Sequence, residues 1–385
     1  MSDFILTKDQ NTAISGIKGF IADPTRKTFL LDGSAGTGKT TMLKSISELG
    51  TTVICALTNK ATNVLRDKGF PKATTLDRVI KQSIYSPITR PPTPEEITFY
   101  KESGIESPEV ITVPNYEKVD SEETGLLVVV DEASMTSEAN FQDLLGLYPK
   151  VIYVGDRFQL PPVEGSQWFQ TASPDVTLSE IVRTVAGSEI TQLANFVRKQ
   201  SPEWKKHDWQ TEVSMVSRYE PRAVDNALLN ADIVLAHKNA TCDTMNCRIR
   251  HLRGLEMLHD QTQPQKGDTL LAWEANKKNE IVKSEIYGVL HSNPTNGGYF
   301  VRLALPREPV VNVSKATLRE QKSEIIVPNT LRFSFAHCIT AHKSQGSEWD
   351  DVVVLAYDHA VKWPDHWNWI YTAVTRAKKH LSVII

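Results

Sequence analysis

Short apolar runs alternate with amphipathic helical stretches along most of this chain, which is the pattern of parallel α/β layers. In the first half we expect strands over residues 28–31, 52–56, 126–130 and 151–154. In the second half the same pattern predicts strands over residues 233–236, 352–356 and 381–385. Three of the first four runs end at a turn with distinctive polar residues, where open α/β sheets place their ligands.

Two segments interrupt this alternation. Residues 82–123 contain six prolines, and the aromatic residues Phe99 and Tyr100 stand among charged ones. An irregular surface loop is the alternative there, but structureless loops beyond about 15 residues are uncommon inside domains. Residues 274–334 show short β-type runs with turn signals such as NPTNGG at 293–298, which predict a small β-barrel insert.

The first distinctive turn has the sequence GSAGTGKT at residues 33–40, between the strand 28–31 and a helical stretch that we expect from Thr41. Strand, glycine loop and helix in this order predict a P-loop, whose backbone N–H groups bind phosphate. Lys39 is expected to reach the β and γ phosphates of ATP, and Thr40 to bind Mg²⁺. The expected nucleotide contacts of the loop are Gly36, Gly38, Lys39, Thr40 and Thr41.

Two further strands end in residues that suit hydrolysis. The strand 126–130 leads into Asp131 and Glu132. Asp131 suits a second Mg²⁺ contact, and Glu132 suits the group that orients and deprotonates the attacking water. The strand 151–154 leads into GDRFQLPP at 155–162, where Gln159 could contact the γ phosphate. A proline-stiffened turn is the equally weighted alternative for that last segment.

Composition narrows the class of protein. The 385 residues are 40% hydrophobic and 23% charged, as in globular proteins of two ordinary domains. The formal net charge of −3 argues against an indiscriminately basic nucleic-acid coat. No apolar run approaches the roughly 20 residues that span a bilayer, and no signal peptide is evident, so we expect no membrane partner. Four scattered cysteines without zinc-type spacing favour a reduced, cytoplasmic setting.

These segments, in their order, resemble the motifs of superfamily 1 helicases, in particular the RecD-like group that includes the bacteriophage Dda-type helicases. The resemblance extends through nearly the whole chain, and its most specific parts are the P-loop, residues 131–134, 340–348 and 371–377. The resemblance also includes TKDQ at 7–10, ALTNKAT at 56–62 and GDRFQLPP at 155–162, while TLDR at 75–78 and residues 178–184 are weak matches on their own.

The resemblance implies an α/β fold with two RecA-like parallel-sheet domains, over residues 1–178 and 179–385. It places a pin-bearing insert at 82–123 in the first domain and a Src-homology-3-like barrel at 274–334 in the second. Phe99 and Tyr100 are the candidates for a strand-separating pin, although aromatic residues also fill small local cores. The barrel segment departs from the family, because KSEIYG at 283–288 stands where an Asn-Gly-Glu-x-Gly stretch is usual.

The resemblance also assigns residues around the nucleotide. Gln10 would recognise adenine, Gln345 and Glu348 would join the nucleotide's edge, and Arg183 and Arg376 would be arginine fingers. Two arginines of the second domain that meet phosphates bound on the first would make hydrolysis sensitive to domain closure. A surface ion pair is the alternative for each arginine taken singly.

A nucleic-acid track is the last implication of the resemblance. Its members are small polar donors that suit phosphate contacts without base recognition: Thr58, Asn59, Thr75, Thr340 and His342. Helix capping and turn formation are the alternative roles of Thr and Asn. Asp77 stands where relatives often have histidine, and its charge would repel phosphate.

The leading hypothesis is therefore an ATP- and Mg²⁺-dependent motor that moves along single-stranded DNA and unwinds duplex junctions, with 5′→3′ polarity implied by the family alone. The alternative is a nucleic-acid-stimulated ATPase that clamps or remodels without separating strands. A nuclease role lacks support, because no second cluster of acidic residues and lysine is evident. The resemblance leaves replication or recombination proteins open as further partners, in the host cytoplasm if the chain is viral.

Overall fold

The computed structural model describes residues 6–82, 88–94, 97, 109–113, 117–118, 127–162, 168–180, 188–255, 262–295, 297–319, 329–359 and 361–385. Arg183, Phe99 and Tyr100 lie outside the described residues, so their predicted roles stay predictions. In the part of the chain that is described, no helix has the length and apolar character needed to cross a membrane.

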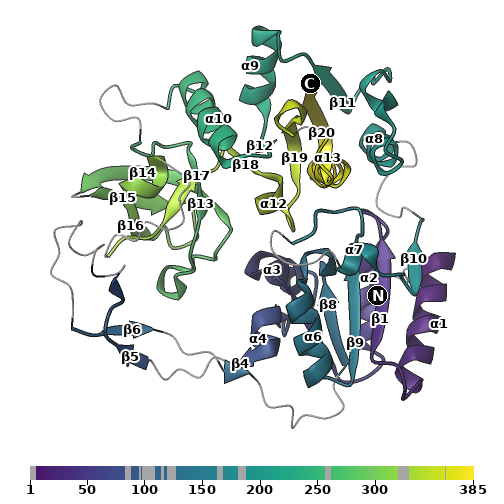
Figure 1. The fold of residues 1–385 in the computed structure, drawn as a ribbon. Coiled ribbons are helices and arrows are strands. Elements are labelled where there is room, and N and C mark those ends of the chain that lie inside the picture. The colour runs from purple at the N-terminus through teal and green to yellow at the C-terminus, as the bar shows by residue number, and fades with distance from the viewer. Residues whose placement is uncertain are drawn as a thin grey trace.

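The first sheet has six strands, and every pair of neighbours is parallel (Figure 1). Its central strands are buried on both faces, which explains why their sequences are continuous apolar runs. In sheet order the strands are β10 (Val176–Leu178), β1 (Thr28–Gly33), β9 (Lys150–Gly155), β8 (Leu127–Asp131), β2 (Thr52–Ala56) and β3 (Thr74–Thr75). One face packs against α1 (Lys8–Ala22), α2 (Lys39–Ser47) and α3 (Asn59–Asp67). The other packs against η1 (Ala133–Met135), α4 (Leu76–Ile80), α6 (Glu138–Leu147) and α7 (Trp168–Thr171).

The second sheet has five parallel strands and stands beside the first at the top of Figure 1. In sheet order these are β11 (Val213–Val216), β20 (Ala377–Ile384), β19 (Trp349–Leu355), β12 (Ile233–Ala236) and β18 (Cys338–Thr340). One face packs against α8 (Glu189–Arg198), η2 (Pro202–Lys205) and α13 (His366–Val374). The other packs against α9 (Pro221–Asn230) and α10 (Asn239–Leu252), while α12 (Ala341–Ser344) and η4 (Ala356–Asp358) follow β18 and β19.

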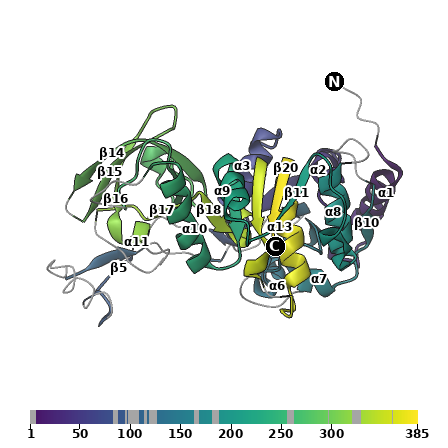
Figure 2. The same ribbon diagram turned by 90° about the horizontal axis from the view of Figure 1, so that it is seen from above.

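The third sheet is antiparallel and lies on the far side of the second sheet from α8 (Figure 2). Its strands are β16 (Val310–Ser314), β15 (Gly298–Leu303), β14 (Ile286–Thr295), β13 (Thr269–Ala272) and β17 (Phe333–Phe335), with η3 (Lys277–Asn279) and α11 (Lys315–Arg319) beside them. The sheet begins with β13, before the expected boundary at residue 274. The sequence does not mark β13 as part of the insert, because this short strand is mostly buried and shows no alternation. Ser284 has φ +68°, a left-handed backbone that residues other than glycine seldom adopt.

Parts of the segment 82–123 form paired strands. β4 (Lys81–Gln82) pairs with β7 (Glu117–Lys118), and β5 (Ile88–Arg90) pairs with β6 (Ile111–Val113), both antiparallel. The described parts are therefore not an irregular loop. Figure 1 places β5 and β6 away from the first sheet, and Figure 2 shows β5 on the side of the antiparallel sheet.

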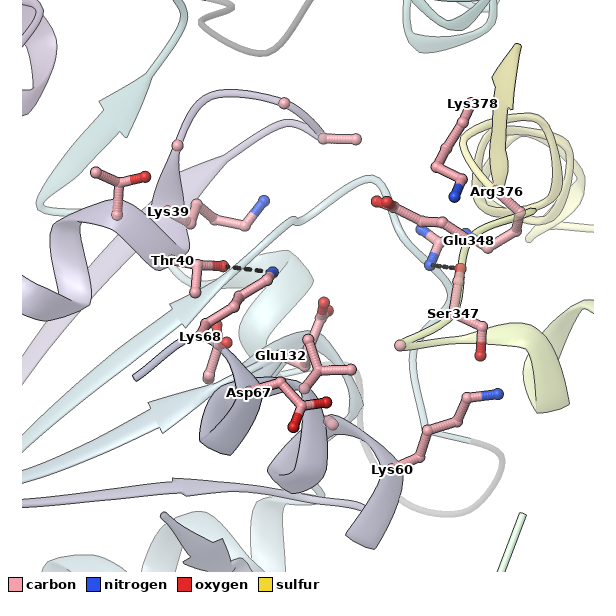
Figure 3. Close-up of a pocket in the computed structure, with 18 of the residues that line it drawn as sticks. Lys39, Thr40, Lys60, Asp67, Lys68, Glu132, Ser347, Glu348, Arg376 and Lys378 are labelled. Atoms are coloured by element: carbon pink, nitrogen blue, oxygen red, sulfur yellow. Dashed lines mark hydrogen bonds between the residues drawn. The ribbon is translucent and has the colours of Figure 1, made fainter. Parts of the chain in front are cut away.

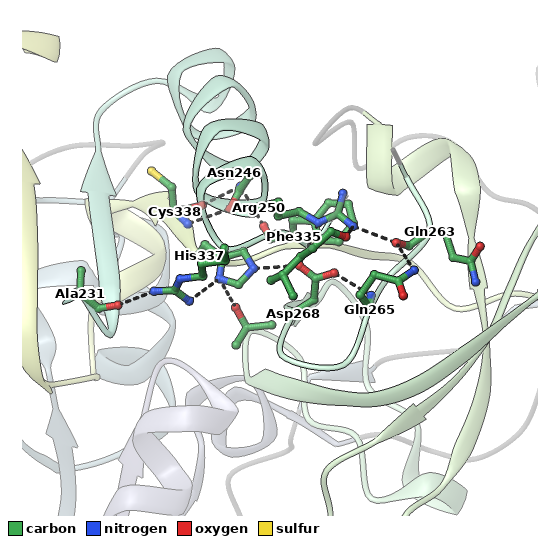
Figure 4. A network of polar contacts seen from close by, with 12 residues as sticks. Ala231, Asn246, Arg250, Gln263, Gln265, Asp268, Phe335, His337 and Cys338 are labelled. Atoms are coloured by element: carbon green, nitrogen blue, oxygen red, sulfur yellow. Dashed lines mark hydrogen bonds and ion pairs between the residues drawn. The ribbon is translucent and has the colours of Figure 1, made fainter. Parts of the chain in front are cut away.

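A buried ionic network joins the second and third sheets (Figure 4). Asp268, which is fully buried, accepts from Arg250 Nε and from His337 Nε2, each at 2.9 Å. Arg250, on α10, also donates to the Gln263 carbonyl at 2.8 Å and stacks 4.0 Å from the ring centre of Phe335. Each of these charges has several partners. The network therefore holds the start of β13, which follows Asp268, against α10.

Candidate nucleotide-binding cleft and nucleic-acid surface

The P-loop connects β1 to α2, which begins at Lys39 rather than at the expected Thr41. Gly36 and Gly38 have φ of +82° and +78°, a left-handed backbone that glycine adopts without strain. At Gly33 a side chain would meet the Thr37 hydroxyl at 2.8 Å. The glycines therefore allow the tight curl that turns backbone N–H groups toward a phosphate.

Lys39 and Thr40 lie at the mouth of this loop. The Lys39 ammonium donates to the carbonyls of Gly33 and Ser34, at 2.6 and 3.0 Å. The Thr40 hydroxyl lies 3.5 Å from Nζ of Lys68, at the end of α3. Lys39 thus uses carbonyl partners that phosphate oxygens would replace by a stronger, charged contact.

Asp131 and Glu132 stand at the carboxyl end of β8 and line the same cleft as Lys39 and Thr40 of α2. Burial, with the negative charge of Glu132, raises the pKa of Asp131 to about 7, against the opposing effect of Lys39. A buried carboxylate with this excess of negative charge suits a cation. The Thr40 hydroxyl and the Asp131 carboxylate are hard oxygen donors of the kind that Mg²⁺ prefers, so the residues fit the predicted metal.

An open cleft of about 1130 Å³ separates the two parallel sheets at this point (Figure 3). The first sheet contributes the P-loop and the second contributes Arg376, so the cleft brings together residues from the two ends of the chain (Figure 3). The predicted residues that line it are Gly36, Gly38, Lys39, Thr40, Thr41, Asp131, Glu132, Gln159, Glu348 and Arg376.

Gln10 and Gln345 are buried away from the lining of this cleft. The Gln10 amide donates to the Thr37 carbonyl at 3.0 Å, and its oxygen accepts from the Thr7 N–H as part of the capping box of α1. The Gln345 amide donates to the Leu160 carbonyl at 3.1 Å. In this arrangement both glutamines bind loops of the first sheet, and a direct nucleotide contact by either stays a prediction.

The loop after β9 packs into the core of the second parallel sheet. Leu160 is fully buried within the core of the second sheet, together with residues of α8 and α13. Its N–H donates to the Thr372 hydroxyl at 2.8 Å. The neighbouring Gln159 is buried and lines the cleft, and its side-chain oxygen finds no partner among the described residues. A buried acceptor without a donor is costly, so Gln159 is available to a ligand that brings one.

Arg376 follows α13 and is 4% exposed. Its guanidinium donates to the carbonyls of Thr372 (2.9 Å) and Ser347 (3.3 Å) and to the Thr375 hydroxyl (3.1 Å). These neutral partners orient the side chain at the edge of the cleft without neutralising it. A guanidinium held in this way can stabilise phosphate charge when the cleft closes.

The predicted nucleic-acid residues fall at the carboxyl ends of strands in both parallel sheets. Thr58 and Asn59 begin α3, Thr75 ends β3, and Thr340 and His342 lie at the start of α12. The hydroxyls of Thr58 and Thr340 accept backbone N–H groups at 3.1 and 3.4 Å, so both residues are helix caps, as the alternative interpretation expected. A capping hydroxyl still has its own proton to donate, and the two roles are compatible.

An aromatic and basic surface that the sequence motifs do not indicate lies beside α12. The Lys343 ammonium lies 4.1 Å from the ring centre of Trp273 and donates to the Asn239 side chain at 3.2 Å. Next to it, Lys238 lies 5.7 Å from the ring centre of Trp363. Lys238 follows the carboxyl end of the expected strand 233–236, where open α/β sheets bind ligands, so its position in the sequence could have indicated it. No local pattern marks Trp273 or Trp363.

The sequence motifs also do not indicate a contact at the far end of the cleft, between α3 and the antiparallel sheet. Lys60 on α3 has an 11% exposed side chain and lies 3.9 Å from a carboxylate oxygen of Glu285. Its ammonium is 5.4 Å from the ring centre of Trp349. Burial lowers the pKa of Lys60, while Glu285 opposes this effect. A contact between α3 and the antiparallel sheet arises only in three dimensions, so no sequence spacing could indicate it.

Comparisons with known proteins agree with this geometry. Residues 335–384 match the family described as UvrD-like helicase C-terminal domain. The ATP-dependent RecD2 DNA helicase of Deinococcus radiodurans is 23% identical over 398 residues, which cover 97% of this chain and 48% of the relative. The uncharacterized protein R530 of Acanthamoeba polyphaga mimivirus is 32% identical over 206 residues, which cover 46% of this chain and 39% of the relative. The chain thus spans about half or less of the length of these relatives.

The fold is that of a solved helicase. The structure of Pif1 helicase from Bacteroides with ADP-AlF3 and single-stranded DNA has a TM-score of 0.54 at 16% identity, covering 99% of this chain and 92% of that one. A structure of two coordinating Pif1 helicases at forked DNA gives 0.52 at 16% identity, with the same coverage. This likeness confirms the predicted α/β fold with a RecA-like parallel-sheet core.

The P-loop, Asp131, Glu132 and Gln159 all fall within residues 6–220, which match the family described as AAA domain. That match covers more than half of the 385 residues, and the chain therefore belongs to the AAA domain family.

Proposed function

We propose that this chain is an ATP-driven motor that moves along single-stranded DNA and separates duplex strands. The observation that carries the proposal is the cleft between the two parallel sheets. It holds the P-loop on one wall and Arg376 on the other, so that binding a nucleotide would draw the sheets together. The similarity to RecD2 and Pif1 helicases supports the same class of activity.

In the proposed hydrolysis each residue has a separate task. Lys39 leaves the carbonyls of Gly33 and Ser34 and binds the β and γ phosphates. Thr40 and Asp131 would hold Mg²⁺, which neutralises phosphate charge when bound. Glu132 orients the attacking water and takes its proton. Gln159 senses the γ phosphate by donating to it from its amide nitrogen, and Arg376, with Arg183 in the same predicted role, stabilises the transferring phosphoryl group.

The proposed strand path crosses the carboxyl edges of both parallel sheets. Thr58, Asn59 and Thr75 would donate to phosphates on the first sheet, and Thr340 and His342 on the second. The surface around Trp273, Lys343 and Trp363 adds stacking platforms and positive charge to that path. Neither kind of contact depends on base identity, which suits stepping along any sequence.

The organisation of the chain belongs to the same proposal. We infer a first domain over 1–178 and a second over 179–385, with the antiparallel sheet as the Src-homology-3-like insert and 82–123 as the pin-bearing insert. Phe99 would be the residue that stacks on the last base pair. The 5′→3′ polarity and the relation to Dda-type helicases rest on the motif resemblance alone.

Strand displacement tests the proposal directly. Duplexes with a 5′ or a 3′ single-stranded tail are incubated with the protein, Mg²⁺ and ATP, and released strand and phosphate are measured together. We expect release from the 5′-tailed duplex, and none with Glu132→Gln, which should still bind ATP. Hydrolysis stimulated by DNA without strand release on either duplex would favour the clamp instead. Absence of hydrolysis would refute both.

A further inference from the structure

Tyr371 links the two parallel sheets through its hydroxyl. The residue lies on α13 of the second sheet and is 1% exposed. Its O–H donates to Oδ2 of Asp156 at 2.7 Å and accepts from the Ala35 backbone N–H at 3.3 Å. Ala35 belongs to the P-loop and Asp156 to the loop after β9. One phenol oxygen therefore joins two loops of the first sheet to a helix of the second.

Among the described residues, Tyr371 is the residue of α13 that forms a hydrogen bond to the P-loop. Thr372 accepts from the Leu160 N–H at 2.8 Å, and Asn368 donates to the Phe158 carbonyl at 3.1 Å. Both of these bonds reach the loop after β9. Of these three α13 residues, Tyr371 is the one that contacts the loop expected to bind phosphate.

Arg376 depends on the same helix end. Its guanidinium is anchored to the Thr372 carbonyl and the Thr375 hydroxyl, within the turn that Tyr371 fixes. A displacement of Tyr371 relative to Ala35 would therefore also displace Arg376 relative to the P-loop. Transition-state stabilisation is sensitive to such displacements, since about 1 Å of misplacement can cost about a hundredfold in rate.

The surroundings of the Tyr371 hydroxyl keep it in its protonated form. Burial, together with the negative charge of Asp156, raises the pKa of Tyr371 well above its usual range. The hydroxyl therefore stays protonated and remains a donor to Asp156. Asp156 is itself fully buried, so the loss of that donor would leave a carboxylate oxygen poorly satisfied.

We propose that Tyr371 is a positioning residue for ATP hydrolysis, which sets the distance between Arg376 and the P-loop by holding Ala35 and Asp156 with one hydroxyl. The inference rests on the proposed ATPase function. It predicts that Tyr371 affects the rate of the chemical step rather than ATP binding, and that it acts only through Arg376.

The test is a double-mutant cycle on ATP hydrolysis by the full chain, with Tyr371→Phe, Arg376→Ala and the double variant. We expect Tyr371→Phe to lower kcat by about ten- to a hundredfold, with KM changed by no more than about twofold. In the Arg376→Ala background, Tyr371→Phe should cost nothing further. Tyr153→Phe is the matched control, because Tyr153 is a buried tyrosine whose hydroxyl has no partner among the described residues.

Asp156→Asn is a second variant for the case that Tyr371→Phe folds poorly. It keeps the size of the acceptor but weakens the bond, so a smaller loss of kcat is expected, again only when Arg376 is present. Multiplicative effects of Tyr371→Phe and Arg376→Ala, or a Tyr371→Phe enzyme as active as Tyr153→Phe, would overturn the inference. A wild-type protein without hydrolysis would instead refute the proposed function.

Discussion

The two junctions that connect the three sheets use different chemistry. Between the parallel sheets, α13 meets the loop after β9 through two bonds between neutral groups and one from the Tyr371 hydroxyl to the Asp156 carboxylate. The amide oxygens of Gln159 and Gln345 lack partners among the described residues. Between the second and the antiparallel sheet, Asp268 is buried with Arg250 and His337 as charged and polar partners. Neutral bonds with unpaired acceptors nearby can be exchanged at low cost, whereas a buried ion pair such as Arg250–Asp268 cannot lose one partner cheaply.

This difference indicates which parts of the molecule move. The first junction borders the open cleft, and its unpaired oxygens would gain partners in another arrangement. The second junction is satisfied as it stands. We therefore expect the nucleotide to change the spacing of the two parallel sheets, while the antiparallel sheet follows the second sheet as one body.

The largest expected effect comes from breaking the ionic junction. Asp268→Asn would remove the buried carboxylate that lies 2.9 Å from Arg250 and should lower the free energy of unfolding by about 3–5 kcal/mol. Denaturant unfolding measures it. The matched control is Asp225→Asn, which removes the partner of Arg248 at 2.6 Å in a pair about one-third exposed. That control should cost less than about 1 kcal/mol, and equal losses would contradict the assigned role of the buried network.

A second prediction concerns the cleft alone. Lys39→Ala should lower ATP hydrolysis by about 100- to 1000-fold, because a charged donor at the phosphates is lost. Its free energy of unfolding should stay within about 1 kcal/mol of the wild type, since the bonds of Lys39 are local. Lys44→Ala, at an exposed lysine of the same helix that also lines the cleft, serves as the control. Full activity of Lys39→Ala would refute the nucleotide assignment.

A third prediction addresses the contact of the antiparallel sheet with α3. A double-mutant cycle of Lys60→Met and Glu285→Gln should give a coupling of about 0.5–1 kcal/mol in the free energy of unfolding. The pair is only 3.9 Å apart, and the side chain of Lys60 is 11% exposed. Additive effects would mean that the two residues are neighbours without an interaction, and that the ionic network alone holds the antiparallel sheet.

The smallest expected effect is a pH dependence of the ionic junction. Burial lowers the pKa of His337 below its usual value, against the opposing effect of Asp268. The unfolded chain therefore binds a proton first as the pH falls. The stability that His337 contributes in its neutral form is complete above about pH 6.5 and declines below it. Unfolding of the wild type and of His337→Gln at pH 7.5 and 5.5 should show a steeper decline for the wild type. Parallel declines would exclude His337 as a contributor.

Much of the first sheet and the P-loop follow from local sequence. The runs at 52–56 and 233–236 form strands with the expected bounds, because a strand buried on both faces must be apolar throughout. The glycines of the P-loop mark left-handed backbone that few other residues adopt. Arg376 and Glu132 could be found because they stand in longer motifs.

The remaining features depend on tertiary contacts that no spacing encodes. Leu160 looks like part of a turn in the sequence, but it packs into the core of the second sheet. The buried position of Tyr371 between two loops has the same origin. The expected insert excludes β13, because a four-residue strand with three apolar residues and no alternation resembles any core segment.

Distance measurements test directly whether the junction between the two parallel sheets moves while the junction to the antiparallel sheet stays fixed. A spectroscopic label on the exposed Cys247 of α10 is paired with a second label, at Lys18→Cys on α1 or at Arg302→Cys on β15. The distance distribution is recorded with and without Mg²⁺ and a non-hydrolysable ATP analogue. We predict that the distance between α10 and α1 changes on binding while that between α10 and β15 stays constant. A constant first distance, or a change in the second, would contradict this account.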